Sequence, residues 1–178
     1  MADKVRVATM WLSGCSGCHM SFLDQDEALI DMANQIQLVY SPIVDVKVFP
    51  ENVDVTLVEG AVANEDQQEL LKFARERTKI LISLGDCAVT GNVTGLRNAF
   101  NDNVEAVLNR AYVETADVQP QIPTETPGLL PRALPLHEVV KIDFYIPGCP
   151  PSAGLINYVI SQLLRGLPVS MEGKSKYG

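Results

Sequence analysis

The chain has 178 residues, of which 47% are hydrophobic and 20% are charged, and its formal net charge is −8. This length fits one domain with a sizeable core, and the composition excludes wholesale disorder. The negative charge argues against a nucleic-acid surface, which needs clustered Lys and Arg to neutralise phosphates. We expect no membrane span, because no apolar run reaches the about 20 residues that a bilayer requires.

The first residues, MADKVRVATMWL, lack the basic region, apolar stretch and small-residue cleavage site of a secretory signal, and they contain no twin-arginine pair. We therefore expect a cytoplasmic protein. Thiols stay reduced in the cytoplasm, so the cysteines are expected to bind metal or do redox work rather than form structural bridges.

Strand-like and helix-like segments alternate along the chain. In chain order we expect a strand at 4–12, a helix at 18–35, a strand region at 36–48 that is interrupted at Pro42, a strand at 53–62, a helix at 64–78, a strand at 79–87, one or two short helices within 92–110, a strand at 141–149 and a helix at 150–166. Residues 114–137 carry five prolines and are expected to be irregular, since that density does not suit a helix or a central strand.

This alternation predicts an α/β fold, a single doubly wound domain over residues 1–178 with a mainly parallel sheet. The almost continuously apolar run at 79–84 supports it, because parallel strands are usually covered on both faces. Such sheets bind ligands outside the carboxyl ends of their strands, where the strand order reverses.

All four cysteines follow predicted strands. Cys15 and Cys18 form a C-x-x-C pair after the first strand, Cys87 ends ILISLGDC and Cys149 ends FYIPGC. Because the carboxyl ends of parallel strands share one edge, we expect the four thiols to meet in space. Glycines beside each cysteine allow sharp turns and present N–H donors to a bulky group. The residues favour a Cys₄ [4Fe–4S] cluster.

Three other interpretations stay open from the residues alone. A thioredoxin-like dithiol would use Cys15 and Cys18 and leave Cys87 and Cys149 in the core. A structural zinc site would use all four, although such sites usually draw on two C-x-x-C pairs. A disulfide is disfavoured in a reducing compartment.

Three polar residues accompany the cysteines. His19 either donates a hydrogen bond near the site or simply begins the helix. Glu59 ends the third strand, where its carboxylate either points into the same edge, to relay protons or contact a partner, or faces water. Asp86 is expected to shape the turn before Cys87.

Four motifs, WLSGCSGCHMSFLD, VEGAV, LGDCAVTGNVTGLRN and IPGCPPS, resemble in this order the small, electron-transferring subunit of [NiFe] hydrogenases, in particular of the cytoplasmic NAD-reducing class. The resemblance spans nearly the whole chain. It implies a flavodoxin-like fold and one [4Fe–4S] cluster, proximal to the Ni–Fe centre, with Cys15, Cys18, Cys87 and Cys149 as ligands.

The same resemblance implies the partners. The Ni–Fe centre would lie in a separate large subunit, and electrons would pass toward diaphorase subunits that contain Fe–S clusters and FMN and reduce NAD. The chain would act in a NAD-dependent hydrogen dehydrogenase without being catalytic alone. Its four cysteines leave no ligands for the further clusters of periplasmic uptake hydrogenases.

Related classes match less well. Complex I has a related cluster subunit, but its first motif carries adjacent cysteines instead of C-x-x-C. Sulfhydrogenases and methanogen hydrogenases usually carry more cysteine motifs. The alternative function is therefore a related Fe–S subunit of another cytoplasmic hydrogenase or of a complex-I-like assembly. A structural Cys₄ zinc-binding module is a further, less favoured alternative. A flavin at the same edge lacks support, since the loop after the first strand has no Ser/Thr-rich phosphate cradle.

Overall fold

The computed structural model describes residues 4–100 and 103–174, so the predicted domain's residues 1–3, 101–102 and 175–178 lie outside it. Its main sheet has the strand order β2-β1-β3-β5-β7, and every pairing in it is parallel. These strands are β1 (Val5–Trp11), β2 (Ile36–Tyr40), β3 (Val53–Glu59), β5 (Thr78–Leu84) and β7 (Phe144–Ile146). This is the flavodoxin-like order, and it confirms the predicted doubly wound α/β fold.

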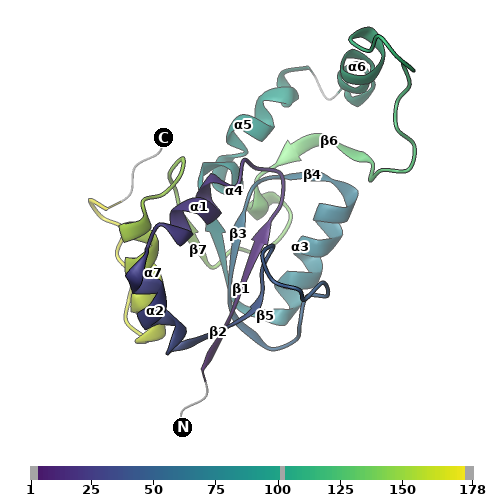
Figure 1. The fold of residues 1–178 in the computed structure, drawn as a ribbon. Coiled ribbons are helices and arrows are strands. Elements are labelled where there is room, and N and C mark those ends of the chain that lie inside the picture. Colours follow the sequence, from purple (N-terminus) through teal and green to yellow (C-terminus); the bar gives the residue numbers. More distant parts are fainter. Residues whose placement is uncertain (1–3, 101–102, 175–178) are drawn as a thin grey trace.

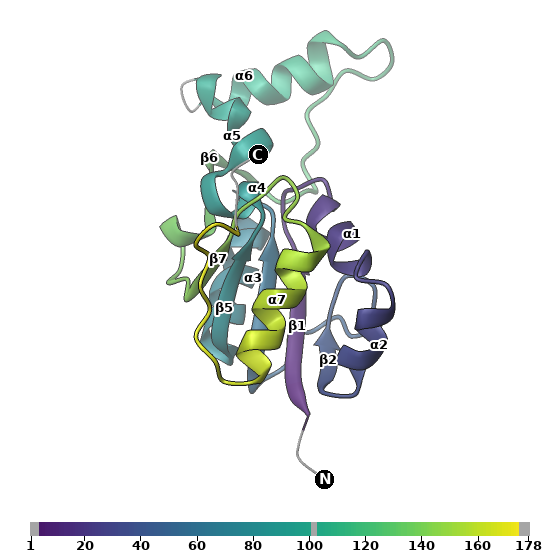
Figure 2. The same ribbon diagram turned by 90° about the vertical axis from the view of Figure 1, so that its left-hand side faces the viewer.

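Helices cover both faces of the sheet (Figures 1 and 2). The helices on one face are α1 (Gly17–Leu23), α2 (Glu27–Ala33) and α7 (Ala153–Leu164), and α3 (Glu65–Arg77) lies on the other. Side chains of β3 serve both layers: Val55 and Leu57 pack in the core with α7, whereas Val58 on the opposite face packs in the core with α3. The strands are apolar on both sides for this reason.

The single helix predicted at 18–35 is wrong, because the structure has two helices there. The chain turns between α1 and α2, and Asp26 adopts a positive φ of 49°. Aspartate tolerates that conformation better than most residues, since its short polar side chain can bond locally. Asp26 thus lies in the turn, and Glu27 begins the second helix.

Several predicted strands are shorter than expected: the one at 79–87 ends at Leu84, and the one at 141–149 is a strand only over β7. The region 36–48 is a strand only over β2, before Pro42. The strand predicted at 53–62 ends at Glu59, where Gly60 with φ of 91° turns the chain. A Cβ on Gly60 would lie 2.8 Å from the backbone of Ser13, so this turn requires glycine. The close approach aligns the ends of β1 and β3.

An arm of short helices extends from the carboxyl ends of the strands (Figure 2). Its elements are α4 (Asp86–Thr90), α5 (Asn92–Gly95), the 3₁₀ helix η1 (Leu96–Phe100), α6 (Val104–Asn109) and the π-helical turn η2 (Arg110–Glu114). Short helices are confirmed in the region 92–110 outside residues 101–102.

The proline-rich segment 114–137 is not irregular throughout. It contains the strand β6 (Leu129–Leu134), which pairs antiparallel with β4 (Val62–Asn64) in a separate two-stranded sheet, and the short 3₁₀ helix η3 (Leu136–Glu138) begins near its end. A two-stranded sheet has edge positions where Pro131 needs no N–H partner. No helix within 4–100 or 103–174 is long and apolar enough to cross a membrane.

Candidate metal centre

The structure places the four cysteines beyond the carboxyl ends of three strands of the parallel sheet, β1, β5 and β7. Cys15 lies in the loop after β1 and Cys18 in α1, Cys87 lies in α4 directly after β5, and Cys149 follows β7. All four are free thiols; Cys18 and Cys87 are buried, whereas Cys15 and Cys149 are exposed. The predicted placement at the carboxyl ends of the strands is confirmed, although Cys87 lies in a helix and does not end the strand predicted at 79–87.

The thiols lie close enough to influence one another. Burial raises the pKa of the Cys18 thiol, and Glu59, Cys87, Cys15 and Cys149 each raise it further by electrostatic interaction. Both effects favour the protonated form of the Cys18 thiol. A bound metal would replace that proton, since thiolates rather than thiols are metal ligands.

Gly85 makes room for the Cys18 thiol. Its φ is 82°, and a Cβ built on it would lie only 2.2 Å from Cys18 Sγ. Any other residue would be strained by its backbone conformation and would displace the sulfur. The turn before Cys87 thereby brings a second cysteine-bearing loop against Cys18.

Hydrogen bonds tie the loop of Cys87 to the loop of Cys149. The buried carboxylate of Asp86 accepts from the Gly148 N–H at 2.6 Å, and the Asp86 N–H donates to the Gly148 carbonyl at 2.9 Å. The predicted role of Asp86 in shaping its turn therefore extends to joining two loops that are 62 residues apart.

The loop of Cys15 and Cys18 is tied in the same way. Ser21 in α1 donates its hydroxyl to the Pro151 carbonyl at 2.5 Å, which links α1 to the segment after Cys149. Thr94 in α5 donates its hydroxyl to the Ser13 carbonyl at 2.8 Å. All three cysteine-bearing loops are thus cross-linked by hydrogen bonds, which sequence reasoning missed.

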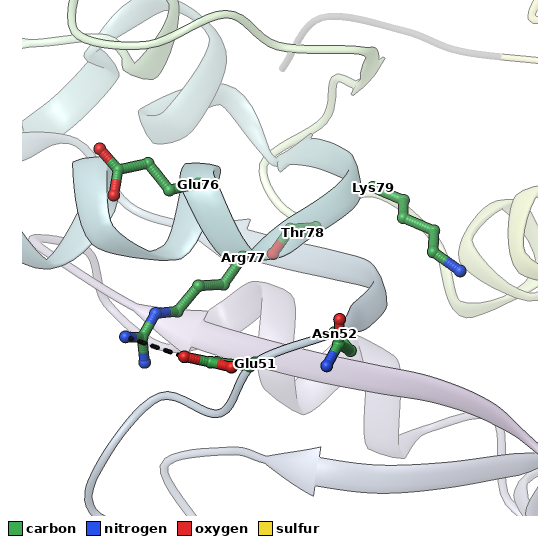
Figure 3. A pocket seen from close by; sticks show the side chains of 6 residues that line it. All are labelled: Glu51, Asn52, Glu76, Arg77, Thr78 and Lys79. Atoms are coloured by element: carbon green, nitrogen blue, oxygen red, sulfur yellow. Dashed lines mark ion pairs between the residues drawn. The ribbon is translucent and has the colours of Figure 1, made fainter.

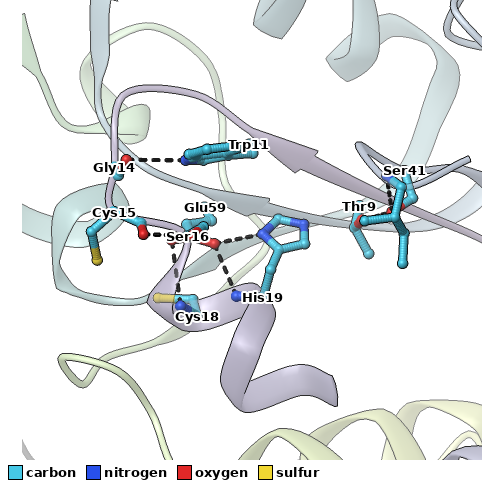
Figure 4. A network of polar contacts seen from close by, with 10 residues as sticks. Thr9, Trp11, Gly14, Cys15, Ser16, Cys18, His19, Ser41 and Glu59 are labelled. Carbon is cyan, nitrogen blue, oxygen red and sulfur yellow. Dashed lines mark hydrogen bonds and ion pairs between the residues drawn. The ribbon is translucent and has the colours of Figure 1, made fainter. Parts of the chain in front are cut away.

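Glu59 lies beneath the C-x-x-C loop and does not face water, since its exposure is 2%. One carboxylate oxygen accepts from the Cys18 N–H at 3.4 Å, and the other accepts from the His19 N–H at 2.9 Å and contacts the His19 Nδ1 at 2.5 Å. In Figure 4 the His19 ring points away from the thiols of Cys15 and Cys18. His19 therefore supports the loop through Glu59.

The donor set suits an iron–sulfur cluster, which cysteine thiolates hold four at a time. A single zinc ion needs its sulfurs about 2.3 Å from one point. Among the residues that the structure describes, no three His, Cys, Asp or Glu side chains are grouped to hold one metal ion. A separate polar pocket lies at the opposite, amino-terminal ends of β3 and β5, where Arg77 pairs with Glu51 at 3.6 Å (Figure 3).

Comparison with known proteins gives a consistent result. A family model described as "NADH ubiquinone oxidoreductase, 20 Kd subunit" matches residues 15–163, a span that includes all four cysteines. The chain is 40% identical over 174 residues to "NAD-reducing hydrogenase HoxS subunit delta" of Cupriavidus necator, and the match covers 94% of this chain and 82% of that one.

Two further relatives extend the comparison. The chain is 39% identical over 178 residues to one subunit of the F420-non-reducing hydrogenase of Methanothermobacter marburgensis, covering 96% of this chain but 57% of that longer one. A chain in the solved structure "Crystal structure of NAD+-reducing [NiFe]-hydrogenase in the H2-reduced state" superposes with a TM-score of 0.92 and 35% identity, over 99% of this chain and 100% of that chain.

The agreement extends over the fold and nearly the full sequence. The relatives named above are hydrogenase subunits, and the family model takes its description from the related NADH–ubiquinone oxidoreductase. The chain therefore belongs to the 20 kDa NADH–ubiquinone oxidoreductase subunit family and, within it, to the small subunits of hydrogenases.

Proposed function

We propose that this chain is the electron-transfer small subunit of a NAD-reducing [NiFe] hydrogenase and holds one [4Fe–4S] cluster on Cys15, Cys18, Cys87 and Cys149. The observation that carries the proposal is the convergence of four thiols from three loops at the carboxyl edge of one parallel sheet. The similarity to the delta subunit and to the NAD⁺-reducing hydrogenase chain supports it.

The bound cluster would accept and release single electrons between the Ni–Fe site of a large subunit and the diaphorase. The chain's own residues fix the four ligands, keep water from the buried Cys18 and Cys87, and present backbone N–H groups to the sulfurs. Glu59 holds the C-x-x-C loop, and Asp86 holds the loops of Cys87 and Cys149 together.

The partners belong to the same proposal. The large subunit carries the Ni–Fe centre, and diaphorase subunits with Fe–S clusters and FMN reduce NAD. Three exposed apolar side chains lie close in sequence to the proposed ligands. Trp11 precedes Cys15, Met20 follows Cys18, and Val93 follows Cys87. Such side chains suit an interface that covers the cluster edge. Four unpaired cysteines suit a cytoplasmic location, where thiols stay reduced.

A related subunit of another hydrogenase, or of a complex-I-like assembly, is the second candidate. The match to the Methanothermobacter relative and the description of the family model favour it. The large and electron-accepting subunits that co-purify with the chain distinguish the two candidates, since a diaphorase with FMN belongs to the NAD-reducing class.

Cysteine variants test the ligand set. Cys87→Ser and Cys149→Ser should each lower the iron and acid-labile sulfide content of the anaerobically purified chain severalfold, because either change removes a ligand. Ser16→Gly is the control: it lies between Cys15 and Cys18, removes no thiol, and suits the φ of 67° at that position. A thiol oxidoreductase that used Cys15 and Cys18 alone would keep its activity in both serine variants. Retention of full iron content in them would contradict the proposed ligands.

A further inference from the structure

Asn92 makes a contact that the proposed ligand set does not explain. Its side-chain Nδ2 lies 3.4 Å from Cys149 Sγ, although the two residues are 57 positions apart in the chain. A thiolate can only accept hydrogen bonds, so the amide must present its NH₂ end to the sulfur. Asn92 thus reaches from the segment after Cys87 to the ligand of another loop.

The backbone that places this amide adopts an unusual conformation. Gly91 has a φ of 88° and Asn92 a φ of 32°, so two consecutive residues lie in the left-handed region. Asparagine tolerates that region better than other residues with a Cβ. This tolerance alone is a reason for asparagine here, so a test must separate the backbone role from the amide role.

The residues after Asn92 add further N–H donors. Burial raises the pKa of Cys87, while the backbone N–H groups of Val93 and Thr94 hydrogen-bond to that thiol and act in the opposite direction. Residues 92–94 therefore offer N–H groups to the sulfurs of two cysteines from two different loops.

We propose that Asn92 is a positioning residue that raises the reduction potential of the bound cluster by donating its side-chain N–H to the Cys149 sulfur. The inference rests on the proposed function, since it requires a redox cluster on Cys149. Reduction adds negative charge to a cluster and its thiolates, so an N–H donor stabilises the reduced state more than the oxidised state.

Two substitutions separate the roles. Asn92→Gly keeps the left-handed backbone but removes the amide, and Asn92→Asp keeps the size but places an acceptor and a negative charge at the sulfur. In the full chain purified anaerobically, we expect the reduced-to-oxidised ratio at a fixed potential to fall about tenfold in Asn92→Asp, which is 59 mV for a one-electron couple. Asn92→Gly should shift in the same direction by less. The ratio is followed by EPR during redox titration.

Asn52 provides the matched control, because it too has a positive φ, 58°, but lies before β3 at the opposite end of the sheet. Asn52→Gly and Asn52→Asp should leave the potential unchanged. Wild-type potentials in both Asn92 variants would overturn the inference. Asn92 would then serve only to accommodate the left-handed backbone. A wild-type chain without iron, sulfide or an EPR signal would instead overturn the proposed function, so the two failures are distinguishable.

Discussion

Glu59 orders the loop that carries two of the four cysteines. Its carboxylate is almost fully buried and contacts three N–H or ring-nitrogen groups of Cys18 and His19. A buried carboxylate without such partners would be costly, so the loop and the acid stabilise each other. Gly14 lets the loop lie close against the residue that follows Glu59, since a Cβ there would lie 3.2 Å from Gly60 Cα.

Glu59→Gln should therefore destabilise the chain. The amide NH₂ would face an N–H group of the C-x-x-C loop, so we expect a loss of about 1–3 kcal/mol in the free energy of unfolding. Urea denaturation of the anaerobically purified full chain measures it. Glu51→Gln is the control, because the Glu51 side chain is 72% exposed and lies at the far end of the sheet. Equal stability of the two variants would show that Glu59 does not hold the loop.

At this scale the sequence predicted the cysteines and little of what supports them. Cysteine is rare and chemically distinctive, and each one stands at the end of an apolar strand, so four positions pointed to one edge. Asn92 and Asp86 act on loops 57 and 62 residues away, and no local pattern encodes such contacts. The position of Glu59 at a strand end beside Gly60 indicated that its carboxylate could point toward the cysteines. Its burial depends on the packing of the loops and could not be predicted from the sequence.

Among the elements, β5 and β7 are fastened by a carboxylate in the turn before β7. Asp143 accepts from the Leu81 N–H at 2.8 Å and from Arg75 Nη1 of α3 at 2.5 Å. Partial burial acts to raise the pKa of Asp143, but the hydrogen bonds from Leu81 and Arg75 outweigh it and hold the pKa below its usual range. This ion pair joins α3 to the amino-terminal end of β7, the strand that Cys149 follows at its other end.

Asp143→Asn should change how the free energy of unfolding depends on pH. Because the pKa of Asp143 is lower in the folded chain, its contribution to stability is present above the unfolded value of 3.8 and is lost as pH falls through the folded value. At pH 7 we expect the variant to be less stable by about 1–2 kcal/mol, with the difference shrinking below about pH 4. Unfolding curves across pH measure it, with the exposed Asp45→Asn as control. A pH-independent difference would contradict this role.

The helices and strands were predictable where the apolar residues recur with a strong period. They were less predictable where single turn residues change the direction of the chain. The apolar strands β1, β3 and β5 and the helix α3 match their predicted positions within a few residues. The split between α1 and α2 depends on one positive φ at Asp26, which an apolar period of 3.6 does not reveal. The strand β6 escaped prediction because its partner β4 lies 65 or more residues away and because it contains Pro131.

For the whole molecule, the cluster edge is the face on which the proposal places the large subunit. Met20 follows Cys18 by two residues and its exposure is 63%. Ile30 is 69% exposed and belongs to α2, a helix that lies farther from that edge than α1 (Figure 1). Exposed apolar side chains at an interface core become buried on assembly, and a charge there is costly.

Met20→Asp should therefore weaken assembly without emptying the cluster site. We expect the large subunit recovered with an affinity-tagged variant to fall at least severalfold, while the iron content per chain stays at the wild-type value. Ile30→Asp should retain the large subunit, as a matched change on another face. Equal recovery with both variants would place the interface elsewhere on the molecule.

The proposed function requires that four cysteines at one end of the parallel sheet hold one [4Fe–4S] cluster. The most direct measurement is the iron, acid-labile sulfide and zinc content of the anaerobically purified full chain, combined with EPR after reduction. We predict about four iron atoms and four sulfides per chain and an EPR signal that appears on reduction. Stoichiometric zinc without iron or sulfide would contradict the claim and leave a structural Cys₄ site in its place.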